Sequence, residues 1–293
     1  YEPKRRASAM GFYQLGATVG GALGMFLGGW LAMSLGWRWA FILIGAPGVL
    51  AGLIIKLTMK EPPRGMSEGR SVSDTQPTIL EVARLTLSRP TFRHIIFGKT
   101  LFAIQLYGSA LWLPSFLHRS HHLNLGEIGT VLAIMGLAGG TLGSLGGGLI
   151  SDVLARRDRR WWMWLTAVTG IAAVPFGIAG YLVSNVWLAL FLLFIPAVTT
   201  SFNTAPGFAV AQRLVALNMR AMTSALLLFI VTLFGAGLGP LLIGLGSDAL
   251  LTNVGEDSLR YALLAALIFK FWGSVHYYFA GLNVVQDLER APD

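Results

Sequence analysis

The sequence contains no cysteine and few charges, and both shortages restrict what the chain can be. Lysine, arginine, aspartate and glutamate together make up 12% of its 293 residues, whereas hydrophobic residues make up 54%. A typical soluble domain carries about 25% charged residues. The longest stretch without charge runs for 51 residues, from Trp161 to Ala211. The absence of cysteine excludes disulfide bonds and cysteine-bound metal, and the shortage of charge indicates a membrane protein.

Eight apolar segments are long enough to cross a bilayer, whose core takes about 20 apolar residues per helix. The 51-residue stretch supplies two spans, with Ser184 and Asn185 as the turn between them. The other six lie at residues 10–34, 39–59, 92–117, 128–150, 221–247 and 261–282. We therefore expect an all-α, polytopic membrane protein.

The net charge of +8 is distributed unevenly between the two sides of these spans. If the loop before the first span is cytoplasmic, 17 of the 22 lysines and arginines lie on the cytoplasmic side and three, Arg38, Arg119 and Arg260, lie opposite. Such asymmetry follows the positive-inside rule and gives no indication of nucleic acid as a partner. It places both ends of the chain in the cytoplasm.

An internal repeat with an offset of 215 residues relates the first span to the seventh. Arg5 matches Arg220, Gly20 matches Gly235, and Gly24 matches Gly239. Small residues four apart allow helix backbones to approach closely, so we expect a packing role for the glycines of both copies, although glycine-rich helices also match by chance. The packing glycines are Gly20, Gly24, Gly28, Gly29, Gly235 and Gly239.

Counting spans between the two copies gives a repeat unit of six helices, an organisation common in transporters. Residues 1–59 then form the last two helices of a first half, and residues 92–293 form a complete second half. On this interpretation four helices should precede Tyr1, and the chain is a fragment that would not transport by itself. Residues 60–91 form a cytoplasmic linker, in which "TILEVARLTL" predicts a short amphipathic helix on the membrane surface with Ile79, Val82, Leu85 and Leu87 on one side.

Several motifs, in the expected order, resemble those of the major facilitator superfamily. They are the two glycine series, Gly20-x-x-x-Gly24-x-x-x-Gly28-Gly29 and Gly235-x-x-x-Gly239-Pro240, with "GWRWAF" and "GGLISDVLARRDRRWW". Two further stretches, "KEPPRG" and "LWLPSFLHRSHHLNLGEIG", resemble the spinster-like branch. The resemblance covers essentially the whole chain. It implies a twelve-helix fold in two halves, of which helices 5 to 12 are present, and a secondary carrier of a small organic or amphiphilic solute, lysolipid-like or anionic.

In that superfamily the seventh and tenth helices line the central cavity, so the resemblance indicates where a solute would bind. On residues 92–117, Phe102, Gln105, Ser109, Trp112 and Phe116 recur at helical spacing and form one stripe, which is equally consistent with helix packing. The tenth helix is interrupted by Pro196 and Pro206, and such a break requires protein or water beside it. The residues expected at the cavity are Lys99, Phe102, Gln105, Ser109, Trp112, Thr199, Asn203 and Pro206. Asn203 is the principal candidate, with a packing role as the alternative.

Ionisable residues inside spans are functional candidates. Lys99 would either meet an anionic headgroup or extend its ammonium to the interface. Lys270 would pair within the bundle or meet substrate, and His276 suits an interfacial position. No aspartate or glutamate falls in the middle of a visible span, so coupling to protons or another ion would depend on a carboxylate outside this sequence.

A cytoplasmic latch is implied by the resemblance. Asp152 would face the positive N-terminus of the first helix near Arg5 and Arg6, beside Arg156 and Arg157, with Arg220 at the matching boundary of the second half. The alternative is an ordinary solvated loop.

Other functions are less well supported by the sequence. An enzyme would need clustered acid–base or metal-binding groups, and His118, His121 and His122 have no carboxylate nearer than Glu127. No phosphate-binding loop occurs, and we expect neither catalytic residues, nor a metal, nor a cofactor. A channel or receptor stays open as an alternative. We expect membrane lipids and a small solute as partners, a monomer when full length, and the bacterial inner membrane as location.

Overall fold

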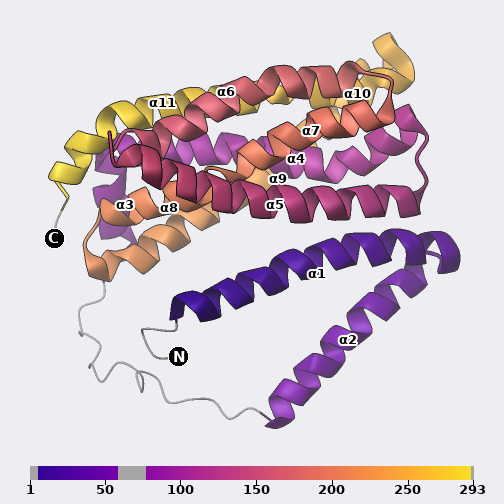
Figure 1. Cartoon of the computed structure of the whole chain (residues 1–293), viewed down its shortest axis with the longest axis horizontal. Helices are drawn as coiled ribbons and strands as arrows, with labels where there is room; N and C mark the ends of the chain where they lie inside the picture. Colours follow the sequence, from indigo (N-terminus) through magenta and orange to yellow (C-terminus); the bar gives the residue numbers. More distant parts are fainter. Residues whose placement is uncertain (1–5, 59–76, 292–293) are drawn as a thin grey trace. The chain divides into compact units, whose positions relative to one another are not determined.

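The computed structural model describes residues 6–58 and 77–291, and within these ranges every regular element is a helix (Figure 1). The described residues fall into two compact units. The first contains the N-terminal helices together with Leu123–Leu137, and the second contains Pro77–His122 and the chain from Ala138 onwards.

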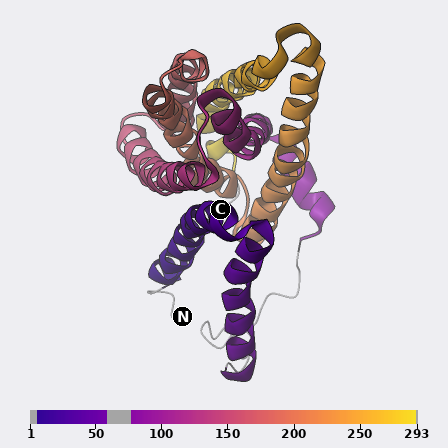
Figure 2. The same cartoon turned by 90° about the vertical axis from the view of Figure 1, so that its right-hand side faces the viewer.

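The first unit is built on a helical hairpin. Helices α1 (Arg6–Leu35) and α2 (Trp37–Thr58) meet at Gly36, whose φ of +83° suits glycine, and they diverge from that turn as the indigo ribbons of Figure 2 show. The beginning of α5 (Leu125–Ala155) packs on α1. There, a Cβ on Gly29 would lie 3.0 Å from Cα of Gly129, and the Trp30 indole donates a 3.0 Å hydrogen bond to Thr130.

The second unit is a helical bundle. Its members are α3 (Ile79–Ser88), α4 (Pro90–His121), the later part of α5, α6 (Trp161–Leu182), α7 (Val186–Ser201), α8 (Thr204–Arg213), α9 (Arg220–Val254), α10 (Ser258–Ala265) and α11 (Leu267–Glu289), with short 3-10 turns at Leu217–Met219 and Gly255–Asp257. Within the described residues the predicted spans are helical, with interruptions at Phe202–Asn203 and at Ala266. The turn at Ser184 and Asn185 is confirmed, and Asn185 caps α7 by accepting from the backbone N–H of Leu188 at 3.0 Å.

The helices are long and apolar enough for a membrane. Six stretches of the described chain meet that requirement, and the longest, Leu217–Glu289, contains both α9 and α11, while α1 adds the shorter apolar segment Val19–Leu35. These observations support the predicted polytopic, all-α fold.

Helix α4 packs closely on α9 and α11, and glycine allows both contacts. A Cβ on Gly108 of α4 would lie 2.7 Å from the carbonyl oxygen of Gly239 on α9. A Cβ on Gly273 of α11 would lie 3.0 Å from the carbonyl oxygen of Gly98. These backbones therefore touch directly, which in a membrane replaces the hydrophobic effect as the source of helix association.

The predicted packing glycines behave differently in the two units. Gly235 and Gly239 both face α4, as expected. Within the first unit, by contrast, a Cβ on Gly20 or Gly24 would meet no atom within 4 Å, and one on Gly28 would make only an ordinary 3.7 Å contact with Ile44. Close approach on α1 is confined to Gly29 in the described residues.

Helix α3 confirms the short helix expected in the linker. Thr78 and Glu81 form a capping box at its start. Val82 and Thr86 are buried, whereas Ile79 and Leu87 are exposed. The expected apolar residues are therefore divided, with Val82 inside the protein and Ile79 and Leu87 on its outer side, and Thr86 takes a buried position by donating its hydroxyl to the Val82 carbonyl at 2.7 Å. Contact of the outer side with a membrane surface stays a prediction.

Candidate functional site

The chain breaks between α7 and α8, at Phe202 and Asn203. Pro206 has no backbone N–H and therefore cannot donate to the carbonyl of Phe202 four residues earlier. Asn203 keeps helical dihedral angles (φ −77°, ψ −11°) and its carbonyl accepts from the N–H of Gly207 at 3.1 Å. The result is a short interruption inside an apolar bundle, where polar backbone groups need partners other than the helix itself.

Lys99 of α4 reaches this interruption. Its ammonium donates to the side-chain oxygen of Asn203 at 2.9 Å and to the Asn203 carbonyl at 3.2 Å. It also lies 4.4 Å from the centre of the Phe208 ring, within the range of a cation–π contact. Gly207 leaves room for this side chain, because a Cβ there would lie 2.5 Å from Cε of Lys99.

Lys270 of α11 reaches the last turns of α7, just before the interruption. Its ammonium donates to the carbonyl of Pro196 at 2.9 Å and to the hydroxyl of Thr200 at 2.5 Å. The side chain is completely buried, and its ammonium lies 5.5 Å from the centre of the Phe102 ring. Two lysines from different helices therefore reach the same interrupted segment.

Asn203 connects these groups. Its oxygen accepts from Lys99 and, at 3.3 Å, from the hydroxyl of Tyr277, while its amide nitrogen donates to the carbonyl of Thr200. The amide oxygen thus accepts two hydrogen bonds and the amide nitrogen donates one at the break, and the residue is buried, with 7% of its surface exposed.

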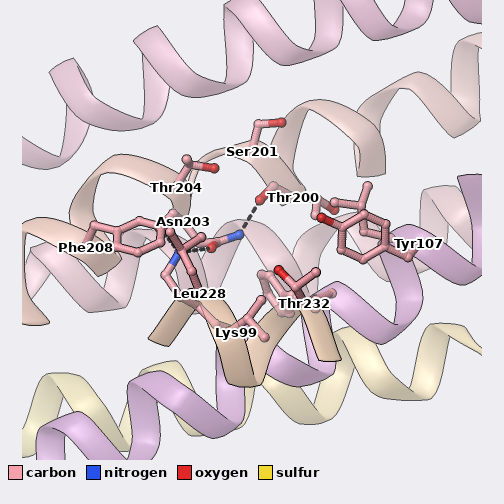
Figure 3. A pocket seen from close by; sticks show the side chains of 13 residues that line it. Lys99, Tyr107, Thr200, Ser201, Asn203, Thr204, Phe208, Leu228 and Thr232 are labelled. Atoms are coloured by element: carbon pink, nitrogen blue, oxygen red, sulfur yellow. Dashed lines mark hydrogen bonds between the residues drawn. The ribbon is translucent and has the colours of Figure 1, made fainter. Parts of the chain in front are cut away.

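A cavity of about 190 Å³ opens beside the break (Figure 3). One wall carries the Lys99 ammonium and the hydroxyls of α7 and α8, and the other is largely apolar. Its lining residues are Lys99, Phe102, Ala103, Leu106 and Tyr107 of α4, Thr200, Ser201, Asn203, Thr204 and Phe208 of the broken helix, and Leu228, Val231 and Thr232 of α9.

Neither buried lysine has an acidic partner in the part of the chain that the structure describes. The ion pair seen there, Asp257 with Arg260 at 3.0 Å, lies at the start of α10. Isolated cations in an apolar interior are costly, and here neutral oxygens and rings take the place of a carboxylate. The site therefore offers a cation, several hydroxyls and an apolar wall to a solute.

Comparison with known proteins assigns the chain to a family. Residues 1–240 match the sequence profile of the Major Facilitator Superfamily. The chain belongs to that superfamily. An MFS-type efflux pump of Mycolicibacterium smegmatis is 30% identical over 297 residues, covering 98% of this chain and 66% of that protein.

Within the Major Facilitator Superfamily, the chain is spinster-like. Protein spinster homolog 1 of Xenopus tropicalis is 27% identical over 308 residues, covering 98% of this chain and 59% of that protein. The crystal structure of a bacterial homologue of the human lysosomal transporter Spinster, in an inward-facing and unoccupied conformation, superposes with a TM-score of 0.85 at 26% identity, covering 98% of this chain and 73% of that one. The chain thus spans about three fifths to two thirds of the length of these two sequence relatives. Its relatives thus include an efflux pump and a homologue of a lysosomal transporter.

Three of the residues predicted at the transport cavity line the one described above: Lys99, Phe102 and Asn203. Lys99 is buried, with 6% of its surface exposed, so the alternative in which its ammonium extends to the membrane interface is wrong. Thr199 and Pro206 belong to the break but do not line this cavity, and the Thr199 hydroxyl donates to the carbonyl of Pro196 at 3.1 Å.

The remaining members of the α4 stripe lie away from this cavity and are satisfied by neighbours. Gln105 donates to Ser109 at 3.0 Å. The Trp112 indole donates to the carbonyl of Pro240 on α9 at 2.9 Å. Phe116 is completely buried against Tyr181. These positions therefore make packing contacts within the second unit, and a role for them at the transport cavity stays a prediction.

Only one of the two sides of the predicted latch lies among the described residues. The Asp152 carboxylate is exposed and accepts from the indole of Trp162 at 3.1 Å. Arg156 and Arg157 follow α5 in an exposed turn. Arg5 and the side chain of Arg6 lie outside the described residues, so the latch stays a prediction. Arg220 begins α9, and its buried Nε has no hydrogen-bond partner.

Sequence reasoning missed several groups at or beside this cavity, including Thr200, Thr204 and Tyr277. Thr200 and Thr204 are four residues apart inside the uncharged stretch, and this spacing could have indicated one hydroxyl-bearing face. Nothing in the local sequence indicated Tyr277, which is completely buried beside Asn203 although it follows His276. His276 instead meets His94 of α4, with 3.0 Å between their Nδ1 atoms.

Proposed function

We propose that the protein containing this chain is a secondary transporter that moves an amphiphilic solute with an anionic group by alternating access. The observation that supports it is the Lys99 ammonium at the wall of the cavity, with no acidic partner among the described residues. An anion entering the cavity would supply the missing negative charge, while the apolar wall of α4 and α9 would hold an aliphatic part of the solute.

The proposal extends to location and energy source. The charge asymmetry of the sequence supports a multi-pass protein of the bacterial inner membrane with both ends in the cytoplasm. Coupling to protons or another ion gradient would supply the energy, and the rocking of one half of the fold against the other would expose the site alternately to each side. A monomer is sufficient for this mechanism.

The test uses the whole gene product reconstituted in liposomes. Two probes share one acyl chain: lysophosphatidylglycerol, which is anionic, and monoacylglycerol, which is neutral. We expect saturable transport of the anionic probe and little competition by the neutral one. Flux that stays linear with probe concentration would indicate a channel instead, and no flux above that of protein-free liposomes would refute transport of this class of solute.

Variants then connect the transport to the site. Lys99→Met removes the charge at similar length, and we expect it to raise the half-saturating concentration of the anionic probe by about tenfold, the loss of one charge-assisted hydrogen bond. Lys56→Met is the control, because Lys56 is exposed near the end of α2. Equal affinities for the two variants would exclude Lys99 as the anion contact.

A further inference from the structure

Lys270 is chemically like Lys99 but is placed differently. It does not line the cavity, and none of its surface is exposed. A solute in the cavity would therefore touch Lys99 and not Lys270. The partners of Lys270 are instead the carbonyl and the hydroxyl one turn before the break between α7 and α8.

These partners form a closed set of hydrogen bonds. The Thr200 hydroxyl accepts from Lys270 and itself donates to the carbonyl of Pro196 at 2.7 Å, while Lys270 donates to the same carbonyl. Each group fixes the direction of the other two. The hydroxyl of Thr200 cannot rotate away without losing both of its partners, so α11 controls the orientation of this turn of α7.

Thr200 also connects these hydrogen bonds to the cavity. The carbonyl of Thr200 accepts from the amide of Asn203, and the oxygen of that amide accepts from Lys99. A continuous chain of hydrogen bonds thus runs from α11, through Thr200 and Asn203, to α4. In a low-dielectric interior such networks specify one arrangement, and a partly satisfied network is costly.

A lysine at this place is not explained by packing alone. An apolar side chain of similar length would fill the same volume without the cost of burying an ammonium, and buried ionic groups are often replaceable in this way. What an apolar side chain could not do is hold the Pro196 carbonyl and the Thr200 hydroxyl.

We propose that Lys270 is a positioning residue for transport: it fixes the break between α7 and α8 and thereby places Asn203 and Lys99 at the cavity. It acts through Thr200 and makes no contact with the solute. The inference rests on the proposed function only in assuming that this cavity belongs to the transport path.

The first experiment needs no solute. The 293 residues contain no cysteine, so a cysteine introduced at Thr204, an exposed position at the cavity, can be labelled with a water-soluble maleimide once any cysteines elsewhere in the gene product are replaced by serine. We expect Lys270→Met to change the labelling rate by about threefold or more, equivalent to losing one hydrogen bond. Labelling at Thr252→Cys, exposed on α9, should not change.

Two variants of Thr200 test whether Lys270 acts through the Thr200 hydroxyl. Thr200→Val removes the hydroxyl and should change the labelling rate as Lys270→Met does, whereas Thr200→Ser keeps it and should leave the rate near that of the parent. The double variant Lys270→Met/Thr200→Val should be no more affected than the stronger single variant, because both remove the same interaction. Additive effects, or a parental rate in Lys270→Met, would overturn the proposal. If Lys270→Met fails to fold, the labelling rate of Thr200→Val tests the same hydrogen bond between Lys270 and Thr200.

Transport kinetics separate positioning from binding. With lysophosphatidylglycerol as probe, Lys270→Met should raise the half-saturating concentration by less than Lys99→Met does, and it should add nothing in the double variant Lys270→Met/Lys99→Met, because Lys270 acts only by placing Lys99. An additive rise in the double variant would make Lys270 an independent binding residue and refute its positioning role. If no probe is transported by the parent protein, the proposed function fails, and the labelling experiment still decides the role of Lys270.

Discussion

The carboxylate of Asp287 near the end of α11 accepts a hydrogen bond of 2.8 Å from the backbone N–H of Thr91 at the start of α4. Helix α4 begins with Pro90 after Arg89, whose side chain provides no cap. The anion of another helix therefore takes the place of a local cap at the positive end of α4. A second link closes the same junction, since Arg89 donates to the carbonyl of Arg290 at 2.7 Å.

Removing this cap should lower stability. Asp287 is buried, and Asp287→Ala leaves the N–H of Thr91 without its partner, so we expect a loss of about 1–2 kcal/mol. Thermal unfolding in detergent, followed by tryptophan fluorescence, measures the effect. Asp248→Ala is the control, because that carboxylate is exposed; equal melting temperatures in the two variants would contradict the cap.

Close contact between α4 and α9 should make Gly239 intolerant of a side chain. A Cβ there would lie 2.9 Å from the backbone nitrogen of Gly108, so Gly239→Ala should cost about 1–3 kcal/mol by overpacking. Gly237→Ala, two residues away on the same helix, meets no atom within 4 Å in the described structure and should leave stability unchanged. The same melting assay compares the two, and equal behaviour would refute the contact.

The place of Lys99 depends on the absence of a side chain at Gly207. Gly207→Ala should push the Lys99 chain away from Asn203 and weaken binding of lysophosphatidylglycerol by about three- to tenfold, with little effect on the neutral monoacylglycerol. Gly246→Ala, whose Cβ would make an ordinary 3.7 Å contact, is the matched control. An equal loss for both probes would point to general damage rather than a displaced cation.

The capping box of α3 should make that helix sensitive to acid. The hydrogen bond from the backbone N–H of Thr78 holds the pKa of the Glu81 carboxyl below its ordinary value of 4.5, and the Thr78 side chain acts in the same direction. Because the folded pKa is the lower one, the contribution is fully present above pH 4.5 and is lost as the pH falls through the folded pKa.

Hydrogen exchange checks this dependence. Amides of the first turn of α3, corrected for the intrinsic effect of pH, should lose protection below about pH 4.5, the ordinary carboxyl value. At neutral pH, Glu81→Gln should keep part of the protection, since its amide oxygen still accepts, and Glu81→Ala should lose it. Protection in Glu81→Ala equal to that of the parent would show that the box contributes nothing.

Apolar length and charge distribution are sufficient to predict the helices. A stretch of 51 uncharged residues has to hold two spans, and Ser184 with Asn185 is its polar interruption, so the hairpin of α6 and α7 follows directly. The interruption expected at Pro196 and Pro206 is confirmed only before Pro206, since α7 continues through Pro196. Proline alone does not decide the place of a break, because Pro114, Pro175 and Pro240 lie inside continuous helices. Periodicity identifies the stripe from Phe102 to Phe116, but it cannot decide between cavity and packing, since both place residues on one face of a helix.

Only the tertiary structure decided which polar groups meet. The contact of Lys99 with Asn203 joins residues 104 positions apart, and that of Lys270 with Thr200 joins residues 70 apart; no local pattern carries such information. The sequence by itself determined that the chain is a set of apolar helices long enough to cross a membrane, because bilayer thickness and backbone hydrogen bonding act on each segment separately. The packing of α4 against α9 and α11 determined that Lys99 and Lys270 reach the segment around the break between α7 and α8, because the position of an ammonium depends on how closely the glycines of neighbouring helices allow their backbones to approach.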